Sequence, residues 1–277
     1  MELSCTSFSF PLLSFERALQ AIALLEIPRY DIGAHEGASH IQPSEVEADP
    51  QRVAQRIHHA AGAAGLRASD FFPTFGRGFR DRPVNAADRA VRDGNLTRFR
   101  AIVTCARTLG ARGITLLPGV VWDDLGPERS FDLSVEALRE LLAIASDAGL
   151  RLSVEAHLES VAESPELAGR LCEQVPGLKL TLDYSHFVAG GHSPEEVHRL
   201  VAYAGHFHAR QAGPDRLQAG SKDGTLDFDD IVRRLKAANY DGDLCVEYTW
   251  QEWRDCWHQD VVSESIVLRD QLRRAIG

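Results

Sequence analysis

The sequence predicts a single (β/α)8 barrel, the TIM-barrel fold, over residues 1–277. Eight short apolar runs with strand alternation alternate along the chain with segments whose apolar residues recur at helical spacing. No linker or shift in composition interrupts this repeat, and about 250 residues is the usual length of such a barrel. An open doubly wound sheet would need a Gly-rich phosphate-binding loop after the first strand, and Ser7-Phe8-Ser9-Phe10-Pro11 does not provide one. The closed barrel is therefore the predicted fold.

The individual elements follow from apolar alternation, helical periodicity and the glycines, serines and prolines that separate them. We expect strands at residues 3–8, 30–33, 66–72, 113–117, 152–155, 178–183, 205–210 and 243–247. We expect helices at residues 15–25, 51–64, 95–109, 133–148, 164–176, 193–203, 226–238 and 259–276. Gly65 and Gly110 are placed to end helices, and Ser164-Pro165 is placed to begin one. Strands joined by helical crossovers run parallel, so their carboxyl ends should meet at one rim.

The composition of the chain limits its compartment and its partners. Hydrophobic residues make up 44% of the chain and charged residues 25%, which is typical of a globular protein with a substantial core. The formal net charge of −10 argues against nucleic acid as a partner. The five cysteines have no short paired spacing, so we predict reduced thiols and a cytoplasmic location. No stretch approaches the roughly 20 apolar residues that span a bilayer, so no membrane partner is predicted.

Acidic and imidazole side chains stand at the ends of four consecutive predicted strands. The terminal polar residues of the fifth to eighth strands are Glu155, Asp183, His208 and Glu247. The active site of a TIM barrel lies at the carboxyl ends of its strands, so we expect these four side chains to converge there. Their oxygen-rich donor set suits one divalent ion, Mn²⁺ in the first place, with Mg²⁺ or Co²⁺ as alternatives. Any one of the four could instead be a helix cap, an ion pair or a strand-end hydrogen bond, and only the full set favours a metal site.

Three further histidines accompany this set. His157 and His186 lie just beyond the ends of the fifth and sixth strands, where we expect them to contact a substrate. The alternative for both is a role in the loop that follows the strand. His206 lies two residues before His208 and should point to the same side of the strand, one step deeper. We therefore expect His206 to be packed in the interior.

Four short motifs carry these residues. They read Leu-Ser-Val-Glu-Ala-His at Glu155, Leu-Asp-Tyr-Ser-His-Phe at Asp183 and His186, His-Phe-His-Ala-Arg at His208 and Arg210, and Val-Glu-Tyr at Glu247. In combination they resemble the sugar phosphate isomerase/epimerase family of the xylose-isomerase-like TIM barrel superfamily, and the resemblance covers nearly the whole chain. It implies that the four strand-end residues bind one divalent ion and that the two glutamates among them exchange protons with the substrate. By the same resemblance, His186 and Arg210 contact the substrate.

The sequence departs from two branches of this superfamily. Ketose epimerases carry a glutamate-containing segment after the seventh-strand histidine, where this chain has Arg210-Gln211-Ala212-Gly213, so the substrate stays open. Relatives of the endonuclease IV class need histidines on the second and third strands and an Asp-x-His after the seventh. This chain has His35, but its third strand ends in Phe-Phe-Pro-Thr-Phe and no Asp-x-His follows His208. A trinuclear zinc endonuclease is therefore disfavoured.

We predict a divalent-metal-dependent isomerase or epimerase that acts on a small sugar or sugar-like polyhydroxy carbonyl compound. The metal would act as a Lewis acid on adjacent carbonyl and hydroxyl oxygens. Glu155 and Glu247 would then serve as acid and base across an enediolate. If a β-hydroxyl can leave, the same architecture gives a lyase of the inosose-dehydratase type, which is the alternative. A non-catalytic sugar sensor is less favoured, because a sensor does not need two opposed carboxylates on one ion.

The predicted partner is a small carbohydrate, and the sequence leaves a homo-oligomer open. Trp250, Trp253 and Trp257 follow the last strand at intervals of three and four, which would place them on one face of a helical turn. Such a face would wall the pocket, pack in the core or meet another subunit.

Overall fold

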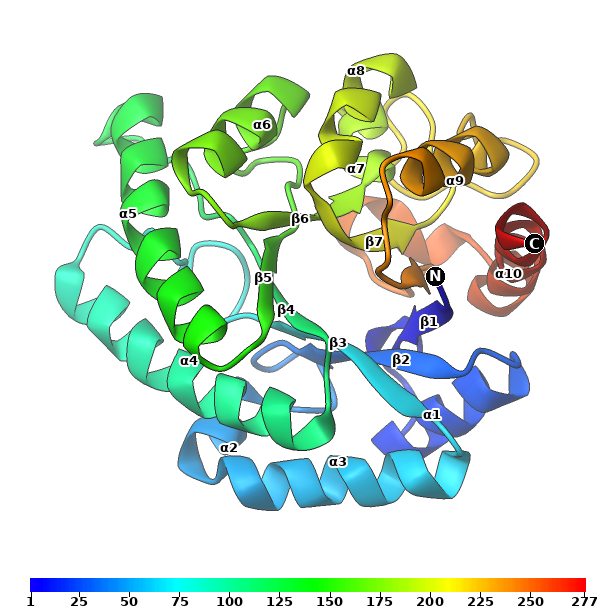
Figure 1. Cartoon of the computed structure of the whole chain (residues 1–277), viewed down its shortest axis with the longest axis horizontal. Helices are drawn as coiled ribbons and strands as arrows, with labels where there is room; N and C mark the ends of the chain where they lie inside the picture. The colour runs from blue at the N-terminus through cyan, green and yellow to red at the C-terminus, as the bar shows by residue number, and fades with distance from the viewer.

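The computed structural model describes all 277 residues and contains a closed barrel of eight parallel strands (Figure 1). The strands are β1 (Leu3–Thr6), β2 (Arg29–Ala34), β3 (Arg67–Pro73), β4 (Gly113–Leu116), β5 (Arg151–Val154), β6 (Lys179–Asp183), β7 (Ala204–Ala209) and β8 (Leu244–Val246). They follow one another around the barrel in sequence order, and β8 pairs in parallel with β1. The predicted TIM-barrel fold is confirmed.

Helices between the strands surround the barrel (Figure 1). The α-helices are α1 (Phe15–Leu24), α2 (Pro43–Ala48), α3 (Pro50–Ala64), α4 (Arg89–Leu109), α5 (Gly126–Asp147), α6 (Pro165–Gln174), α7 (Tyr184–Ala189), α8 (Pro194–His198), α9 (Phe228–Ala237) and α10 (Val261–Ile276). The 3₁₀ helices are η1 (Ser7–Ser9), η2 (Arg199–Tyr203) and η3 (Trp253–His258). No helix combines the length and the apolar character that crossing a membrane requires.

The helix boundaries arise from local signals in the sequence. The Ser164 side chain accepts a hydrogen bond from the backbone N–H of Leu167, with Pro165 as the first helical residue of α6. Gly65 and Gly110 end α3 and α4 with φ of 70° and 69°. This left-handed conformation favours glycine because it has no Cβ. These caps agree with the sequence prediction.

Some boundaries differ from the prediction because side chains cap helices that periodicity does not reveal. Helix α4 begins at Arg89 rather than residue 95, and the Asp88 side chain accepts from the backbone N–H of Ala90. Strand β6 ends at Asp183, as predicted, and Asp183 Oδ1 accepts from the N–H of Ser185 at the start of α7. Helices α2 and α7 are absent from the prediction, and α5 begins earlier than predicted. Six residues are too few to establish a helical period in a sequence.

The tryptophans after β8 do not share one face, which corrects the prediction. Arg254 and Asp255 have φ of 54° and 56°, so the chain turns sharply inside η3. Trp250 and Trp257 pack against each other with ring centroids 6.2 Å apart and are 40% and 39% exposed. Trp253 is directed elsewhere and lines the cavity described below.

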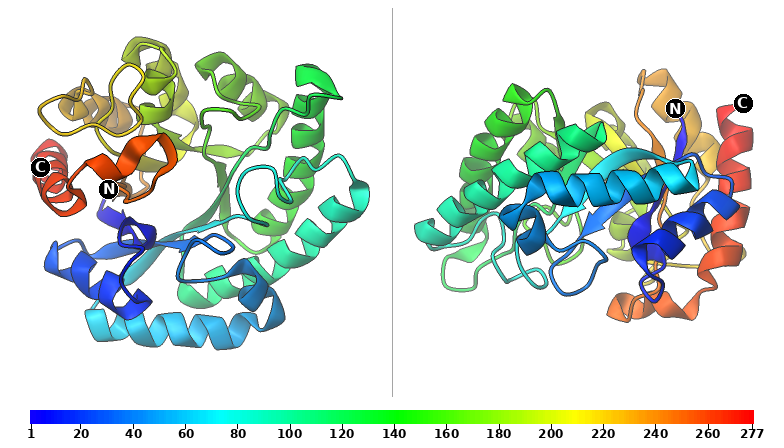
Figure 2. Two further views of the ribbon diagram at one scale, coloured as in Figure 1. Left: turned by 180° about the vertical axis from the view of Figure 1, so that it is seen from behind. Right: turned by 90° about the horizontal axis from the view of Figure 1, so that it is seen from below.

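The two ends of the barrel differ in what they carry. Both chain termini lie at one end, and the loops that follow the strands lie at the opposite end (Figure 2, right). Because all eight strands are parallel, every residue that ends a strand lies at the loop end.

Candidate active site

The predicted site residues lie together at the loop end of the barrel. Glu155 and Glu247 directly follow β5 and β8, and Asp183 is the last residue of β6. His208 lies in β7, opposite Asp183 in the strand register. All four side chains are buried. Buried charges lack the stabilisation that water provides, so neighbouring groups have to compensate them.

Two overlapping groups of donor atoms form at this rim. His208 Nδ1 lies 2.6 Å from Glu155 Oε1 and 3.1 Å from Glu247 Oε2. Glu155 is also close to Asp183 and His186, and His186 Nε2 lies 3.7 Å from Asp183 Oδ2. Within each group of three, the donor atoms lie within 4.8 Å of one another. Glu155 belongs to both groups and links the predicted metal ligands.

Arg210, predicted to contact the substrate, lies against two of these carboxylates. Its NH2 nitrogen is 2.8 Å from Asp183 Oδ2 and 3.5 Å from Glu247 Oε2. The same nitrogen is 3.1 Å from His186 Nε2, and Arg210 Nε donates to Ser185 Oγ at 2.9 Å. Arg210 is the permanent cation in contact with the carboxylates and holds the β6, β7 and β8 residues in one network.

Burial and neighbouring charges shift the proton affinities of these groups. Burial, reinforced by Glu247, raises the pKa of Glu155 to about 7. Burial also raises the pKa of Asp183, although Arg210 opposes the shift. For Glu247, Arg210 and His208 outweigh the burial and lower the pKa. The pKa of His208 is well above its ordinary value, because Glu247 and Glu155 overcome its burial. Protons thus balance part of the buried negative charge.

The donor set fits a hard divalent cation. Three carboxylates and one imidazole supply mostly oxygen ligands, which Mn²⁺ and Mg²⁺ prefer. Glu247 Oε2 is buried and accepts no hydrogen bond. Glu155, Asp183, His208 and Glu247 are the residues that would hold such an ion. A divalent cation would replace the protons that otherwise compensate the carboxylates.

Binding of Mn²⁺ is therefore expected to release protons. Because Glu155 has a pKa of about 7, it has to lose a proton to become a ligand at lower pH. The apparent affinity should rise with pH, by up to about tenfold per pH unit for each proton displaced. Calorimetry in buffers of different ionisation enthalpy would count these protons, and Glu155→Gln should release fewer. Binding at about pH 6 with no proton release would contradict the assignment.

A cavity of about 220 Å³ opens beside the carboxylates. The predicted site residues that line it are Glu155, His157, His186, Arg210 and Glu247. Much of the remaining wall is aromatic and includes Phe8, Phe72, Phe79 and Trp253, together with His35. Apolar walls with a few polar groups are typical of small-molecule sites. The cavity and the donor groups form one continuous site.

Most of the aromatic wall is not predicted from the sequence. Phe72 lies in the aromatic run that ends β3, which could have indicated a lining position. Phe79 lies in the loop after β3 and Trp253 begins η3, and the two rings meet with centroids 5.2 Å apart. The ring of His157 lies 4.6 Å from that of Phe79, and His157 Nδ1 contacts the carbonyl oxygen of Leu158 at 2.6 Å. Contacts between distant loops leave no periodic pattern in a sequence.

Three imidazoles in the cavity wall are held neutral. Burial lowers the pKa of His35 and of His157 to about 4. Burial, reinforced by Arg210, lowers the pKa of His186 well below its ordinary value. His35 Nε2 and His186 Nδ1 are buried and have no hydrogen-bond partner. A neutral imidazole nitrogen can donate to or accept from a ligand hydroxyl.

Comparison with known proteins agrees with the fold. The structure is similar to that of D-psicose 3-epimerase from Clostridium cellulolyticum H10 with D-tagatose (TM-score 0.78, 15% identity, 99% of each chain covered). It is also similar to the probable 3-DHS dehydratase AsbF from Bacillus anthracis (TM-score 0.72, 14% identity, 97% of this chain and 99% of that chain covered). A third similar structure is a xylose isomerase-like TIM barrel protein from Mycobacterium smegmatis in complex with magnesium (TM-score 0.72, 15% identity, 100% of this chain and 98% of that chain covered).

At these identities the structural likeness shows the fold alone. No curated protein sequence matches the chain significantly. The xylose isomerase-like TIM barrel family matches residues 30–270, which is most of the chain. The chain therefore belongs to the xylose isomerase-like TIM barrel family.

Proposed function

We propose that this protein is a divalent-metal-dependent isomerase or epimerase of a small polyhydroxy carbonyl compound. The observation that carries the proposal is that Glu155 and Glu247, from strands separated by β6 and β7, face the same nitrogen of His208 and line one cavity. A divalent cation bound at this rim would polarise a substrate carbonyl and make the neighbouring C–H acidic.

The two glutamates can transfer the proton of the substrate C–H beside the carbonyl. Because Glu155 follows β5 and Glu247 follows β8, they approach a molecule in the cavity from different directions. One glutamate, as a carboxylate, removes the proton beside the carbonyl, and the other, in its protonated form, returns a proton to the opposite face and becomes a carboxylate. This exchange inverts the carbon, which is an epimerisation. Return of the proton to the adjacent carbon gives an isomer instead.

The polar groups of the wall suit a polyhydroxy molecule. His35 Nε2 and His186 Nδ1 have no partner within the protein and can bind substrate hydroxyls. Arg210 adds guanidinium donors at the same wall. The rings of Phe72 and Trp253 would cover the apolar C–H faces of a sugar. These features support a carbohydrate rather than a hydrocarbon substrate.

Deuterium incorporation tests the proposal directly. Mn²⁺-loaded protein would be incubated in D₂O with a panel of ketoses, inososes and keto-acids, and the recovered compounds examined by NMR. We expect exchange at one carbon beside a carbonyl, together with formation of an isomer of the same composition. Protein treated with a chelator is the control. Metal-loaded protein that exchanges no proton in any member of the panel would count against the proposal.

A metal-dependent dehydratase is the second candidate. It is supported by the similar fold of the probable 3-DHS dehydratase and by the same pair of carboxylates, one of which could protonate a leaving hydroxyl. Incubation with the inososes of the panel distinguishes dehydration from isomerisation or epimerisation. A new enone absorbance with loss of water identifies the dehydratase, whereas an isomer of unchanged mass identifies the isomerase or epimerase.

A further inference from the structure

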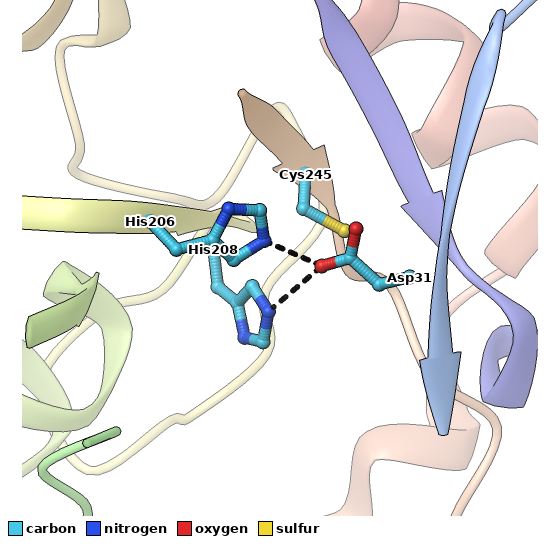
Figure 3. A group of neighbouring side chains, drawn as sticks. All are labelled: Asp31, His206, His208 and Cys245. Carbon is cyan, nitrogen blue, oxygen red and sulfur yellow. Dashed lines mark hydrogen bonds and ion pairs between the residues drawn. The ribbon is translucent and has the colours of Figure 1, made fainter. Parts of the chain in front are cut away.

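A second buried cluster lies in the barrel interior beside the proposed metal ligands. Asp31 from β2, His206 and His208 from β7, and Cys245 from β8 point toward one another (Figure 3). Their donor atoms lie within 4.8 Å of one another, and all four residues are at most 1% exposed. His206 is thus in the interior, as predicted. Asp31 is not identified by the sequence analysis, although it is a carboxylate in a buried strand.

One oxygen of Asp31 faces both imidazoles. Asp31 Oδ2 lies 2.5 Å from His206 Nε2 and 3.4 Å from His208 Nε2 (Figure 3). The first contact is a short hydrogen bond that anchors the carboxylate. The second is longer than an ordinary hydrogen bond, and His208 Nε2 has no other partner. Asp31 is therefore held where it can accept the Nε2–H of His208.

The two nitrogens of His208 thus face different groups. Nδ1 faces Glu155 and Glu247, whereas Nε2 faces Asp31. A neutral imidazole carries one proton, and it can bind a cation only through the nitrogen that lacks it. Glu155 and Glu247 also attract a proton to Nδ1, but a cation bound at these two carboxylates would displace it. The carboxylate of Asp31 then favours the remaining proton on Nε2, which leaves the Nδ1 lone pair free for the cation.

We propose that Asp31 is a positioning residue that selects the Nε2–H tautomer of His208 and so prepares Nδ1 to bind the divalent ion. This inference rests on the proposed function, because it assigns Asp31 a role toward the metal of that site. His206 contributes indirectly, since it holds Asp31 through the same carboxylate oxygen. Ligands oriented by such a carboxylate partner typically lose about 10- to 100-fold in metal affinity when the partner is removed.

The competing reading is a second cation bound among Asp31, His206, His208 and Cys245. One observation favours positioning. Asp31 Oδ2 and His206 Nε2 already share a direct hydrogen bond, so an ion between them would have to replace it.

The first experiment uses the wild-type protein labelled with ¹⁵N-histidine and loaded with diamagnetic Mg²⁺. Long-range ¹H–¹⁵N spectra identify which nitrogen of each neutral imidazole carries the proton, and His208→Gln assigns the His208 signals by their disappearance. We expect a protonated Nε2 and an unprotonated Nδ1 at His208. The opposite tautomer would overturn the inference. This measurement can overturn the inference even if substitutions at Asp31 prevent folding.

The second experiment compares Mn²⁺ binding by Asp31→Asn and Cys245→Ser. Asparagine keeps the shape of the side chain but lacks the carboxylate, and we expect about 10- to 100-fold weaker binding. In the ¹⁵N spectrum of Asp31→Asn, the imidazole proton of His208 should no longer be confined to Nε2. Cys245→Ser changes the member of the cluster that has no role in the proposed positioning, so the Mn²⁺ affinity of this variant should stay close to that of the wild type.

The outcomes separate this inference from the proposed function. If the wild-type protein binds no divalent ion, the metal dependence of the proposed function is contradicted. Equal Mn²⁺ affinity in the wild type and Asp31→Asn would overturn only the role of Asp31. Two ions per chain in the wild type, with one lost in Cys245→Ser, would replace positioning with a second metal site.

Discussion

Glu155→Gln and Glu247→Gln are each expected to lower turnover by about 10²- to 10⁴-fold. Glutamine keeps an oxygen ligand of similar shape but cannot accept a proton at neutral pH. Metal occupancy should largely persist, because the other proposed ligands remain. The measurement is turnover and deuterium exchange at matched Mn²⁺ content. A variant that retains one carboxylate is expected to exchange the substrate proton from the face which that carboxylate serves.

Glu159→Gln provides a matched control for these two variants. Glu159 lies in the loop after β5, is exposed and pairs with Arg254 outside the cavity. Its loss should leave both turnover and exchange near the wild-type values. Near wild-type turnover in Glu155→Gln and in Glu247→Gln would contradict proton transfer by the two glutamates. If the four proposed ligands still held the metal ion, the site would then serve to bind the substrate and not to transfer protons.

Asp183→Ala is expected to abolish tight Mn²⁺ binding while the barrel stays folded. Asp183 has two functions in the structure, however, since Oδ1 caps α7 and Oδ2 pairs with Arg210. Loss of a helix cap alone typically costs about 1 kcal/mol of stability. Asp183→Asn separates the two functions, because the amide oxygen can still accept from the N–H of Ser185 but carries no charge.

If Asp183 is a metal ligand, Asp183→Ala should lose more than about 100-fold in affinity, beyond the range typical for residues that act through a ligand. Asp183→Asn keeps an oxygen ligand and should lose less. Elemental analysis and Mn²⁺ titration measure the loss, and circular dichroism verifies the fold. Asp183→Asn should be the more stable of the two. Stoichiometric metal in purified Asp183→Ala would exclude Asp183 from the ligand set and leave it as a helix cap and a partner of Arg210.

The fold is predictable from the sequence because each unit of the barrel is encoded locally. Alternating apolar residues mark the strands, and caps such as Ser164 and Gly110 mark the helix ends. Helices defined mainly by side-chain capping are harder to detect. Helix α7 depends on one hydrogen bond from Ser185 to Asp183, and six residues show no clear period.

The position of the candidate site is also predictable, whereas its electrostatics are not. Parallel strands carry Glu155, Asp183, His208 and Glu247 to one rim, because residues that end parallel strands lie on the same side. The roles assigned to these residues stay predictions. That Arg210 lies between Asp183 and Glu247, and that Glu155 has a raised pKa, follows from side-chain orientations and burial.

The sequence by itself determines the barrel, the order of its strands and the residues at their ends, because periodicity and capping act over a few residues. Only the tertiary structure decides which side chains from distant strands meet. Asp31 and His206 lie 175 residues apart in the chain and become hydrogen-bonded because closure of the barrel directs their side chains into the same interior. The aromatic cavity wall has the same origin, since Phe79 follows β3 and Trp253 follows β8, at the start of η3. Local spacing cannot encode such contacts, which depend on the closed geometry of all eight strands.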